Sequence, residues 1–177
     1  MEKNQLRDLI QNHSLIKSEV EIQLSSGSKS NYYFDLKQVT MMKKARELMT
    51  KLIWDMVKDD GITAVGGMES GAIPIVDAII DLTPVPHGFY VKKKPKKHGL
   101  SKFIEGILKE DDKILIVEDV STKGTSALKC IGEVQKVNGN IKRIITIVDR
   151  LEGAQEKFSE NGLKLEHLFT RKDFKFD

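Results

Sequence analysis

Short apolar runs recur along the chain, and two of them predict strands that are buried on both faces. Residues 114–117 (ILIV) and 144–148 (IITIV) show no regular alternation of apolar and polar positions. Such runs are typical of parallel strands that helices cover on both sides of a sheet. Weaker patterns predict further strands at residues 20–24, 32–36, 62–66, 88–91 and 165–169.

Helices are predicted between these runs, where apolar positions recur every three or four residues. The clearest pattern covers residues 41–58, in which Met41, Met49 and Met56 are expected to face the core. Gly61 follows this segment and suits the end of a helix. Similar spacing predicts helices at residues 2–13, 71–82, 126–137 and 153–161.

The alternation of strands and helices predicts an α/β fold, with an open, mainly parallel sheet that has helices on both faces. A chain of 177 residues is long enough for one well-packed domain and short for two. We therefore expect a single domain, in which residues 1–40 form a small N-terminal hood and residues 41–177 form the α/β core. In such sheets ligands bind beyond the carboxyl ends of the strands.

The positive charge of the chain is concentrated in one segment. The net charge is +3, and residues 92–97 alone contain five lysines, so the rest of the chain is slightly acidic. A slightly acidic bulk argues against a nucleic-acid partner, whereas a local lysine cluster suits a small, highly charged anion. A solvated lysine-rich loop is the alternative interpretation. The five lysines are Lys92, Lys93, Lys94, Lys96 and Lys97.

Composition also argues against several classes of protein. No apolar stretch approaches the roughly 18 residues of a membrane span, and the N-terminus lacks the basic-then-apolar order of a signal peptide. A cytoplasmic protein without a membrane partner is therefore expected. Cys130 is the only cysteine, which excludes an internal disulfide. No paired metal-ligand spacing is found among His13, His87, His98 and His167.

The strongest candidate for a site is the segment 118–126 (EDVSTKGTS), which follows the ILIV run and precedes a predicted helix. A helix N-terminus presents unpaired N–H groups and partial positive charge, so it favours a phosphate, and Gly124 would let the backbone approach that anion. The carboxylates of Glu118 and Asp119 suit sugar hydroxyls or a divalent cation instead. An ordinary turn with two exposed acids is the alternative. Hydroxyl donors come from Thr122, Thr125 and Ser126.

Two adjacent acids followed by a Thr/Gly/Ser loop resemble the phosphoribosyl pyrophosphate signature of the type I phosphoribosyltransferases. In that family the acids hold the ribose hydroxyls, and the loop holds the ribose 5-phosphate. The resemblance implies that this segment binds phosphoribosyl pyrophosphate. The residues implied are Glu118, Asp119, Val120, Ser121, Thr122, Lys123, Gly124, Thr125 and Ser126.

Two further segments resemble the orotate branch of the family. Residues 26–36 (SGSKSNYYFDL) are similar to its N-terminal SGRKSPYYxDL segment, which implies that orotate binds near Tyr33 and Phe34. Core packing is the alternative role of these two aromatic residues. Residues 66–74 (GGMESGAIP) are similar to the pyrophosphate loop GxExGGIP. That match implies phosphoribosyl pyrophosphate contacts from Glu69, Ser70 and Gly71.

The lysine-rich segment and a later arginine complete the resemblance in chain order. Residues 92–99 (KKKPKKHG) are similar to the mobile loop RKExKxHG. The match implies that Lys92 and Lys93 bind phosphoribosyl pyrophosphate, and that Lys96 and His98 both bind it and act in catalysis. Residues 148–150 match a VDR segment whose arginine, here Arg150, contacts the orotate carboxylate. The alternative role of Arg150 is that of a surface cation. The resemblance also implies that Thr122 contacts orotate.

The chain departs from the family pattern at a few positions, which bear on affinity for phosphoribosyl pyrophosphate more than on the reaction class. Lys92 replaces an arginine, which removes a planar two-pronged donor but keeps a charge. Lys94 and Lys97 stand where an acid or a neutral residue is common. Lys123 replaces a small residue, and Ala72 replaces a glycine.

The resemblance implies transfer of a phosphoribosyl group to orotate, which gives orotidine 5′-phosphate and pyrophosphate in pyrimidine biosynthesis. Lys96, His98 and Asp119 are the implied catalytic residues, and Mg²⁺ is expected to be held mainly through substrate and water. In the family the lysine loop reaches the neighbouring subunit's site, so residues 92–99 are expected to lie outside their own core, in a homodimer with shared sites.

Two other functions remain open from the sequence. One is phosphoribosyl transfer to another base, such as a purine, which would conflict with the hood segment SGSKSNYYFD. The other is a non-catalytic regulator that senses a nucleotide or binds nucleic acid through its lysines. The presence of Lys96, Glu118 and Asp119 argues against the regulator.

Overall fold

A mainly parallel sheet forms the centre of the molecule. The structure is a computed structural model that describes residues 1–23, 27, 29–94 and 103–176. Within these ranges the central sheet has six strands in the order β5-β4-β3-β6-β7-β8, all parallel to their neighbours except β5, which is antiparallel to β4. The strands are β3 (Ala64–Met68), β4 (His87–Val91), β5 (Ile104–Gly106), β6 (Lys113–Ser121), β7 (Asn140–Asp149) and β8 (Glu166–Thr170).

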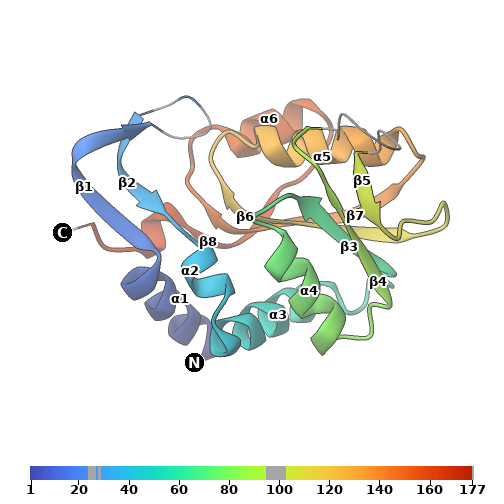
Figure 1. Cartoon of the computed structure of the whole chain (residues 1–177), viewed down its shortest axis with the longest axis horizontal. Helices are drawn as coiled ribbons and strands as arrows, with labels where there is room; N and C mark the ends of the chain where they lie inside the picture. The colour runs from blue at the N-terminus through green and yellow to red at the C-terminus, as the bar shows by residue number, and fades with distance from the viewer. Residues whose placement is uncertain (24–26, 28, 95–102, 177) are drawn as a thin grey trace.

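Helices cover both faces of this sheet, as Figure 1 shows. The first face packs against α1, α3 and α4, and the second against α5 and α6. The predicted open α/β fold is therefore confirmed. None of these helices, in the ranges given above, has the length and apolarity needed to cross a membrane. The helices are α1 (Glu2–His13), α2 (Lys37–Thr40), α3 (Lys43–Val57), α4 (Ile73–Leu82), α5 (Thr125–Gln135) and α6 (Ala154–Glu160), with a 3-10 turn at η1 (Arg171–Asp173).

The ILIV run shows why the central strands lack a polar face. Ile114 and Ile116 of β6 point into the core beneath α5 and α6, whereas Leu115 and Val117 point into the core beneath α1, α3 and α4. All four side chains are fully buried. Successive residues of a strand face opposite sides, so a strand between two helical layers must be apolar at every position.

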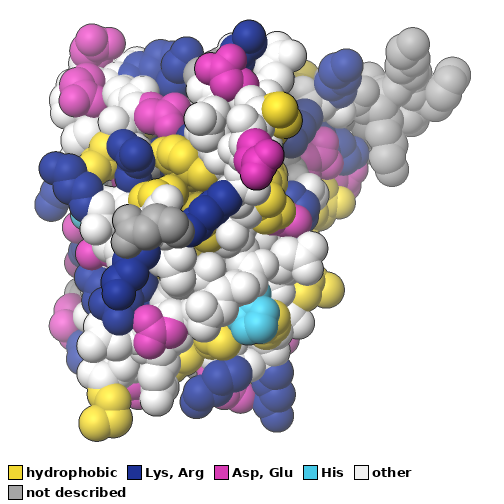
Figure 2. All heavy atoms as spheres, turned by 90° about the vertical axis from the view of Figure 1, so that its left-hand side faces the viewer, with side chains coloured by type: hydrophobic (Ala, Val, Ile, Leu, Met, Phe, Trp, Pro, Cys, Tyr) yellow, Lys and Arg dark blue, Asp and Glu magenta, His cyan; other side chains and the backbone are white. Residues whose placement is uncertain are grey.

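The hood is an antiparallel pair of strands, β1 (Leu15–Gln23) and β2 (Lys29–Phe34). Its aromatic residues pack against the C-terminal segment: the ring centroids of Tyr32 and Phe176 lie 4.6 Å apart, and those of Phe34 and Phe174 lie 5.0 Å apart. Figure 1 shows the hood beside the C-terminus, and Figure 2 shows basic side chains around exposed hydrophobic ones on this side of the molecule. Aromatic contacts therefore join the two ends of the chain.

The helix predicted over residues 41–58 begins two residues later than predicted, at Lys43, after the separate short helix α2. Met42 has an extended backbone (φ −90°, ψ 126°) and precedes α3, so the helical phase restarts at Lys43. Met41 consequently turns outward and is 71% exposed, and its predicted place in the core is wrong. Met49 is buried as predicted, while Met56 is only partly buried.

One hood strand and one edge strand of the central sheet differ from the prediction. The first hood strand begins at Leu15, five residues before its predicted start at residue 20, because Leu15 and Ile16 pair with Phe34 and Tyr33 of β2. The short edge strand β5 was not predicted. It has three residues, all partly buried or exposed, so no apolar run predicts it from the sequence. Only its pairing with β4 defines it.

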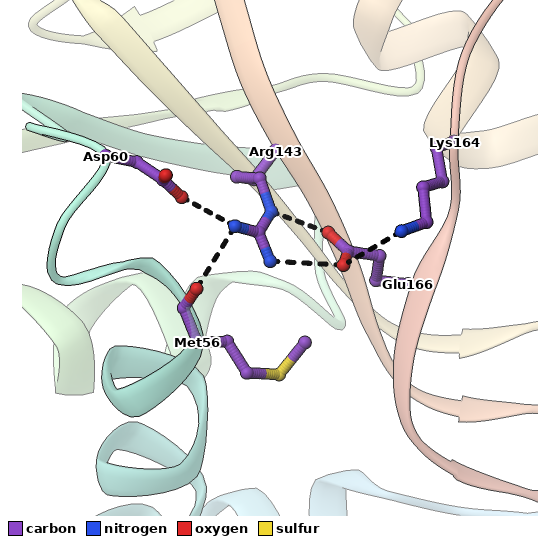
Figure 3. Close-up of polar contacts among 5 residues, drawn as sticks. All are labelled: Met56, Asp60, Arg143, Lys164 and Glu166. Carbon is purple, nitrogen blue, oxygen red and sulfur yellow. Dashed lines mark hydrogen bonds and ion pairs between the residues drawn. The ribbon is translucent and has the colours of Figure 1, made fainter.

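An ion cluster around Arg143 ties α3 to the strands β7 and β8 (Figure 3). The Arg143 side chain donates from Nε and Nη2 to the carboxylate of Glu166, at 2.6 and 3.1 Å. Its Nη1 donates to Asp60 at 2.6 Å and to the carbonyl oxygen of Met56 at 3.1 Å. Lys164 lies 3.6 Å from Glu166, but its side chain is 77% exposed.

Replacing Arg143 with alanine is expected to lower the free energy of unfolding by about 1–3 kcal/mol, because the partly buried carboxylates of Asp60 and Glu166 would lose their cation. Urea denaturation of the purified variant measures this loss. Lys164→Ala is the matched control, and it should change the same quantity by less than about 0.5 kcal/mol. Equal losses in the two variants would contradict a stabilising role specific to Arg143.

Candidate functional site

The acid pair lies on a strand and not in a loop. Strand β6 was predicted to end at Val117, but it continues to Ser121 because its pairing with β7 continues to Asp149. Successive strand residues face opposite sides, so Glu118 faces the α5 side of the sheet, and Asp119 faces the α4 side. The pair therefore projects from the carboxyl end of a central strand, which is where ligands bind in such sheets.

The loop after β6 leads directly into α5. Gly124 precedes the helix with a φ of 68°, and a Cβ atom there would lie 2.6 Å from the ring of Phe158. Both the backbone conformation and the space therefore require glycine. No side chain in the described ranges caps the start of α5, and its first turn contains no acid. Its first N–H groups are thus available to an anion.

Two adjoining cavities lie at this edge of the sheet. The larger cavity has a volume of about 330 Å³ and lies over the loop and the start of α5. The smaller cavity, of about 130 Å³, lies between the hood and the end of β6. The larger is lined by Met68, Lys93, Glu118, Val120, Ser121, Thr122, Lys123, Gly124, Thr125, Ser126, Ala127 and Lys129. The smaller is lined by Tyr33, Phe34, Lys37, Met68, Glu69, Ser70, Gly71, Lys93, Glu118, Asp119, Val120, Thr122, Ser126 and Arg150.

The carboxyl of Glu118 is held in an unfavourable environment. Burial, with a smaller contribution from the charge of Asp119, raises the pKa of Glu118 well above its usual range, and Lys93 offsets the rise in part. Its Oε2 atom is buried and has no hydrogen-bond partner in the described ranges, and the same holds for Oγ of Ser121. Buried polar atoms of this kind need partners, so both are suited to the hydroxyl groups of a ligand.

Asp119 is better satisfied than Glu118. Burial raises the pKa of Asp119, but the backbone N–H of Val120, which donates to Oδ1 at 2.8 Å, and the charge of Lys37 oppose the rise. Its carboxylate packs against Gly71, where an added Cβ atom would lie 2.3 Å from Oδ2. Only glycine at position 71 leaves room for this carboxylate.

The segment after β3 brings its predicted residues to the smaller cavity. Glu69, Ser70 and Gly71 all line that cavity. Oε1 of Glu69 accepts a hydrogen bond of 2.6 Å from the backbone N–H of Lys93, so this segment is connected to the start of the lysine-rich segment. Ala72 is buried beside Gly67, where an added Cβ atom would lie 2.4 Å from the Ala72 methyl group.

Of the two predicted hood residues, Tyr33 is partly buried and Phe34 is buried. Tyr33 and Phe34 both line the smaller cavity. The side chain of Phe34 is nevertheless buried in an edge-to-face cluster with Tyr32, Phe174 and Phe176. Its ring packs in the core, as the alternative interpretation expected, which leaves its backbone to face the cavity.

Arg150 is a buried cation, so its alternative interpretation as a surface cation is wrong. It is 2% exposed and lines the smaller cavity. Its Nε donates to Glu152 at 2.8 Å, its Nη2 donates to Oγ of Ser30 at 2.9 Å, and its guanidinium lies 4.2 Å from the ring centre of Tyr32. The backbone N–H of Arg150 donates to the Ser121 carbonyl oxygen at 2.9 Å. The acid strand and the arginine are thus joined directly.

Known proteins share this architecture and much of the sequence. A model of the phosphoribosyl transferase domain matches residues 35–166. An orotate phosphoribosyltransferase of Rhodopseudomonas palustris (strain BisB5) is 37% identical over 177 residues, which cover 96% of this chain and 94% of that protein. One from Methanocaldococcus jannaschii is 40% identical over 153 residues and covers 86% of each. The chain belongs to the orotate phosphoribosyltransferase family.

A solved structure of the family agrees in fold. The crystal structure of Mycobacterium tuberculosis H37Rv orotate phosphoribosyltransferase in complex with 5-phospho-alpha-D-ribosyl 1-diphosphate superposes with a TM-score of 0.81 at 31% identity and covers 98% of both chains. The orotate phosphoribosyltransferase fold thus extends over nearly the whole chain. The predicted membership of the orotate branch is confirmed.

The lysine-rich segment of this family member is only partly described. Lys93 lines both cavities. Lys92 lines neither of them: it is buried, forms an ion pair with Glu105, and donates its backbone N–H to Phe103 at 2.8 Å. The prediction that residues 92–99 lie outside the core is wrong for Lys92, because it prolongs the β4–β5 pairing. Lys96 and His98 lie outside the described residues.

Several residues around the cavities were not predicted from the sequence. Lys37 and Met68 line the smaller cavity, and Met68 and Lys129 line the larger one. Lys129 also donates to the Lys93 carbonyl oxygen at 2.5 Å. Its position one helical turn after Thr125 was a usable signal, because it places the lysine on the same face of α5 as Thr125, where the loop after β6 ends.

The acids at the site offer few ligands to a metal ion. In the ranges that the structure describes, no three His, Cys, Asp or Glu side chains are grouped closely enough to hold one. Two acids project from β6 at the cavities, Glu118 and Asp119. Glu118 has a buried oxygen without a partner in the described ranges. Their oxygen atoms fit ligand hydroxyls or a hydrated Mg²⁺ ion.

Replacing Glu118 with glutamine is expected to raise the free energy of unfolding of the ligand-free protein by about 1–2 kcal/mol at pH 8, because the variant removes a buried charge that has an unpartnered oxygen. A carboxyl whose folded pKa is raised contributes stability below its unfolded pKa, and this contribution is lost as the pH rises through the folded pKa. The gain should therefore shrink as the pH is lowered toward the usual range of glutamate.

Urea denaturation between pH 5 and pH 8, without ligands, measures this difference. Glu160→Gln is the matched control, since Glu160 is exposed at the end of α6, and it should show little dependence of the difference on pH. A wild-type protein more stable than Glu118→Gln at pH 8 would mean that the buried carboxylate is already satisfied.

Proposed function

We propose that this protein transfers the phosphoribosyl group of phosphoribosyl pyrophosphate to orotate, which yields orotidine 5′-phosphate and pyrophosphate for pyrimidine (UMP) biosynthesis. The observation that carries the proposal is the pair of adjoining cavities, in which the larger holds the loop before α5, the smaller holds Asp119 and the buried Arg150, and Glu118 lines both. The relatives named orotate phosphoribosyltransferase support it. We assign the hood and core to one domain that serves this one site.

The larger cavity suits the phosphoribosyl group. The N–H groups at the start of α5, with the hydroxyls of Thr122, Thr125 and Ser126, would hold the 5-phosphate. Glu118, which lines both cavities, and Asp119, which lines the smaller one, would hold the ribose hydroxyls where the cavities adjoin, and Asp119 would keep the sugar oriented while the bond to pyrophosphate breaks. Val120, Ser121, Lys123 and Gly124 complete this proposed set of contacts.

The smaller cavity would hold the pyrophosphate and the base on either side of the reacting carbon. Glu69, Ser70, Gly71 and Lys93 would contact the pyrophosphate, with Lys92 near by through the same segment. On the hood side Tyr33, Phe34, Thr122 and Arg150 would contact orotate, and the guanidinium of Arg150 suits its carboxylate.

Breaking the bond leaves positive charge on the sugar and negative charge on pyrophosphate, and the protein must stabilise both. The acids on β6 lie on the sugar side, and we assign Lys96 and His98 to the pyrophosphate side, where they would also exclude water. Mg²⁺, held mainly through substrate and water, would neutralise the leaving group. We further propose a cytoplasmic homodimer in which residues 92–99 of one subunit complete the site of the other.

With phosphoribosyl pyrophosphate and Mg²⁺ present, the protein is expected to consume orotate and release orotidine 5′-phosphate, because Arg150 offers a cation to its carboxylate. A panel of orotate, uracil, hypoxanthine and guanine, followed by loss of each base, tests this. Chelation of Mg²⁺ should stop turnover, and restored Mg²⁺ should return it. Turnover of a purine with orotate untouched would overturn the proposal, and failure with every base would favour the regulator.

Two inactive variants are expected to restore activity to each other if the sites are shared between subunits. Lys96→Ala and Asp119→Asn, unfolded and refolded together, form mixed dimers in which one site carries both substitutions and the other carries neither. Random assortment predicts recovery of about a quarter of the wild-type sites by symmetry counting.

Recovered turnover after mixing measures this effect. The control mixes Asp119→Asn with Lys142→Ala, whose exposed lysine lies away from both cavities, and shows how much activity an unaltered partner supplies. If the first mixture stayed inactive after verified subunit exchange, each site would be built from one chain.

A further inference from the structure

Arg150 is held by hood residues that are far from it in the sequence and by Glu152, two residues after it. The ring of Tyr32, in the hood, lies 4.2 Å from its guanidinium, and Ser30 of the same strand accepts a hydrogen bond from Nη2. Glu152 accepts a hydrogen bond from Nε at 2.8 Å, and Tyr32 Oη donates to the same Glu152 oxygen at 3.4 Å. The hood therefore contacts both the cation and its carboxylate partner.

These contacts fix both the plane and the rotation of the guanidinium. Stacking on the Tyr32 ring sets the plane, and the bond from Nε to Glu152 sets which edge of the group turns away from the cavity. Nη1 of Arg150 makes no hydrogen bond to any residue in the described ranges. Since Arg150 lines the smaller cavity, its Nη1 donors remain available to a ligand there.

Tyr32 is itself supported by the C-terminal segment. Its ring centroid lies 4.6 Å from that of Phe176, and the guanidinium of Arg171 lies 5.3 Å from the Tyr32 ring and 5.2 Å from the Phe176 ring. Tyr32 is not among the described residues that line either cavity. Tyr32 and Phe176 can therefore influence a ligand only through neighbours that line the smaller cavity, which are Arg150 and Phe34.

We propose that Tyr32 and Glu152 are positioning residues that select the base by holding the guanidinium of Arg150 toward the smaller cavity, and that Phe176 acts through Tyr32. This inference rests on the proposed function. Two N–H groups from one planar group bind a carboxylate best when their orientation is fixed beforehand, because less ordering is then needed on binding. The stack thus favours a base that carries a carboxylate.

A comparison of Tyr32→Leu with Tyr32→Phe tests the proposal. The leucine variant should raise KM for orotate about tenfold, the usual scale of a partly desolvated cation–π contact. Its KM for phosphoribosyl pyrophosphate should stay within about twofold, because the phosphate loop does not contact Tyr32. Tyr32→Phe retains the ring and should recover most of the orotate affinity. Glu152→Ala should raise KM for orotate as the leucine variant does. Glu152→Gln keeps an acceptor for Nε, so it should raise KM for orotate by a smaller factor.

A second pair of variants keeps the test valid if Tyr32→Leu folds poorly. Phe176→Leu removes the ring that supports Tyr32. Phe174→Leu removes a ring of the same segment that also contacts Phe34, as Phe176 does, but that makes no ring contact with Tyr32 in the described ranges. With melting temperatures recorded for both, only Phe176→Leu should raise KM for orotate relative to KM for phosphoribosyl pyrophosphate.

The outcomes separate this inference from the proposed function. A wild-type protein that consumes no orotate overturns the proposed function, and this inference with it. A wild-type protein that uses orotate, together with a Tyr32→Leu or Phe176→Leu variant whose two KM values are unchanged or rise in equal proportion, overturns the inference alone. A selective rise in KM for orotate, recovered in Tyr32→Phe, supports it.

Discussion

The parallel pairing of β6 with β7 is the constraint on which the rest of the site depends. It continues past the buried ILIV run, through Glu118 and Val120, as far as Ser121 and Asp149. Because the pairing persists, the acids project from a fixed strand and face opposite sides of the sheet. The same ladder brings Arg150 beside Ser121 through a backbone hydrogen bond. One set of backbone hydrogen bonds therefore places both the proposed ribose-binding acids and the proposed orotate-binding cation.

This arrangement has a cost in the ligand-free protein. Glu118 carries a buried oxygen without a partner in the described ranges, and its raised pKa shows that the folded environment disfavours its charged form. Burial of a charge without a partner opposes folding, so it must be offset elsewhere. The offset is available in the apolar layers on both faces of the sheet and in the Arg143 cluster, which lies away from the two cavities. Stability and binding are thus assigned to different parts of one sheet.

The sequence predicted the parts of the fold that depend on local patterns. The uninterrupted run ILIV and the spacing of the core residues of α3 and α5 identified the buried strands and the helices on both faces. Residues 118–121, three of which are polar, were assigned to a loop because composition cannot show that β7 pairs with them. The outward turn of Met41 depends on the extended backbone of Met42, and β5 exists only through its pairing with β4. Each difference arises from a contact or dihedral angle that no periodicity encodes.

The same limit applies to the charges at the site. The sequence gathers five lysines in residues 92–97, but Lys92 is buried and its charge is paired with Glu105. Among the described residues, the cations that line the larger cavity come from three different segments: Lys93 follows β4, Lys123 lies in the phosphate loop, and Lys129 lies on α5. A highly charged anion needs positive charge from several directions, and a cluster in sequence supplies it from one. The fold brings α5 and the end of β4 to one cavity. It thereby surrounds the cavity with positive charge, which the lysine cluster in the sequence does not do alone.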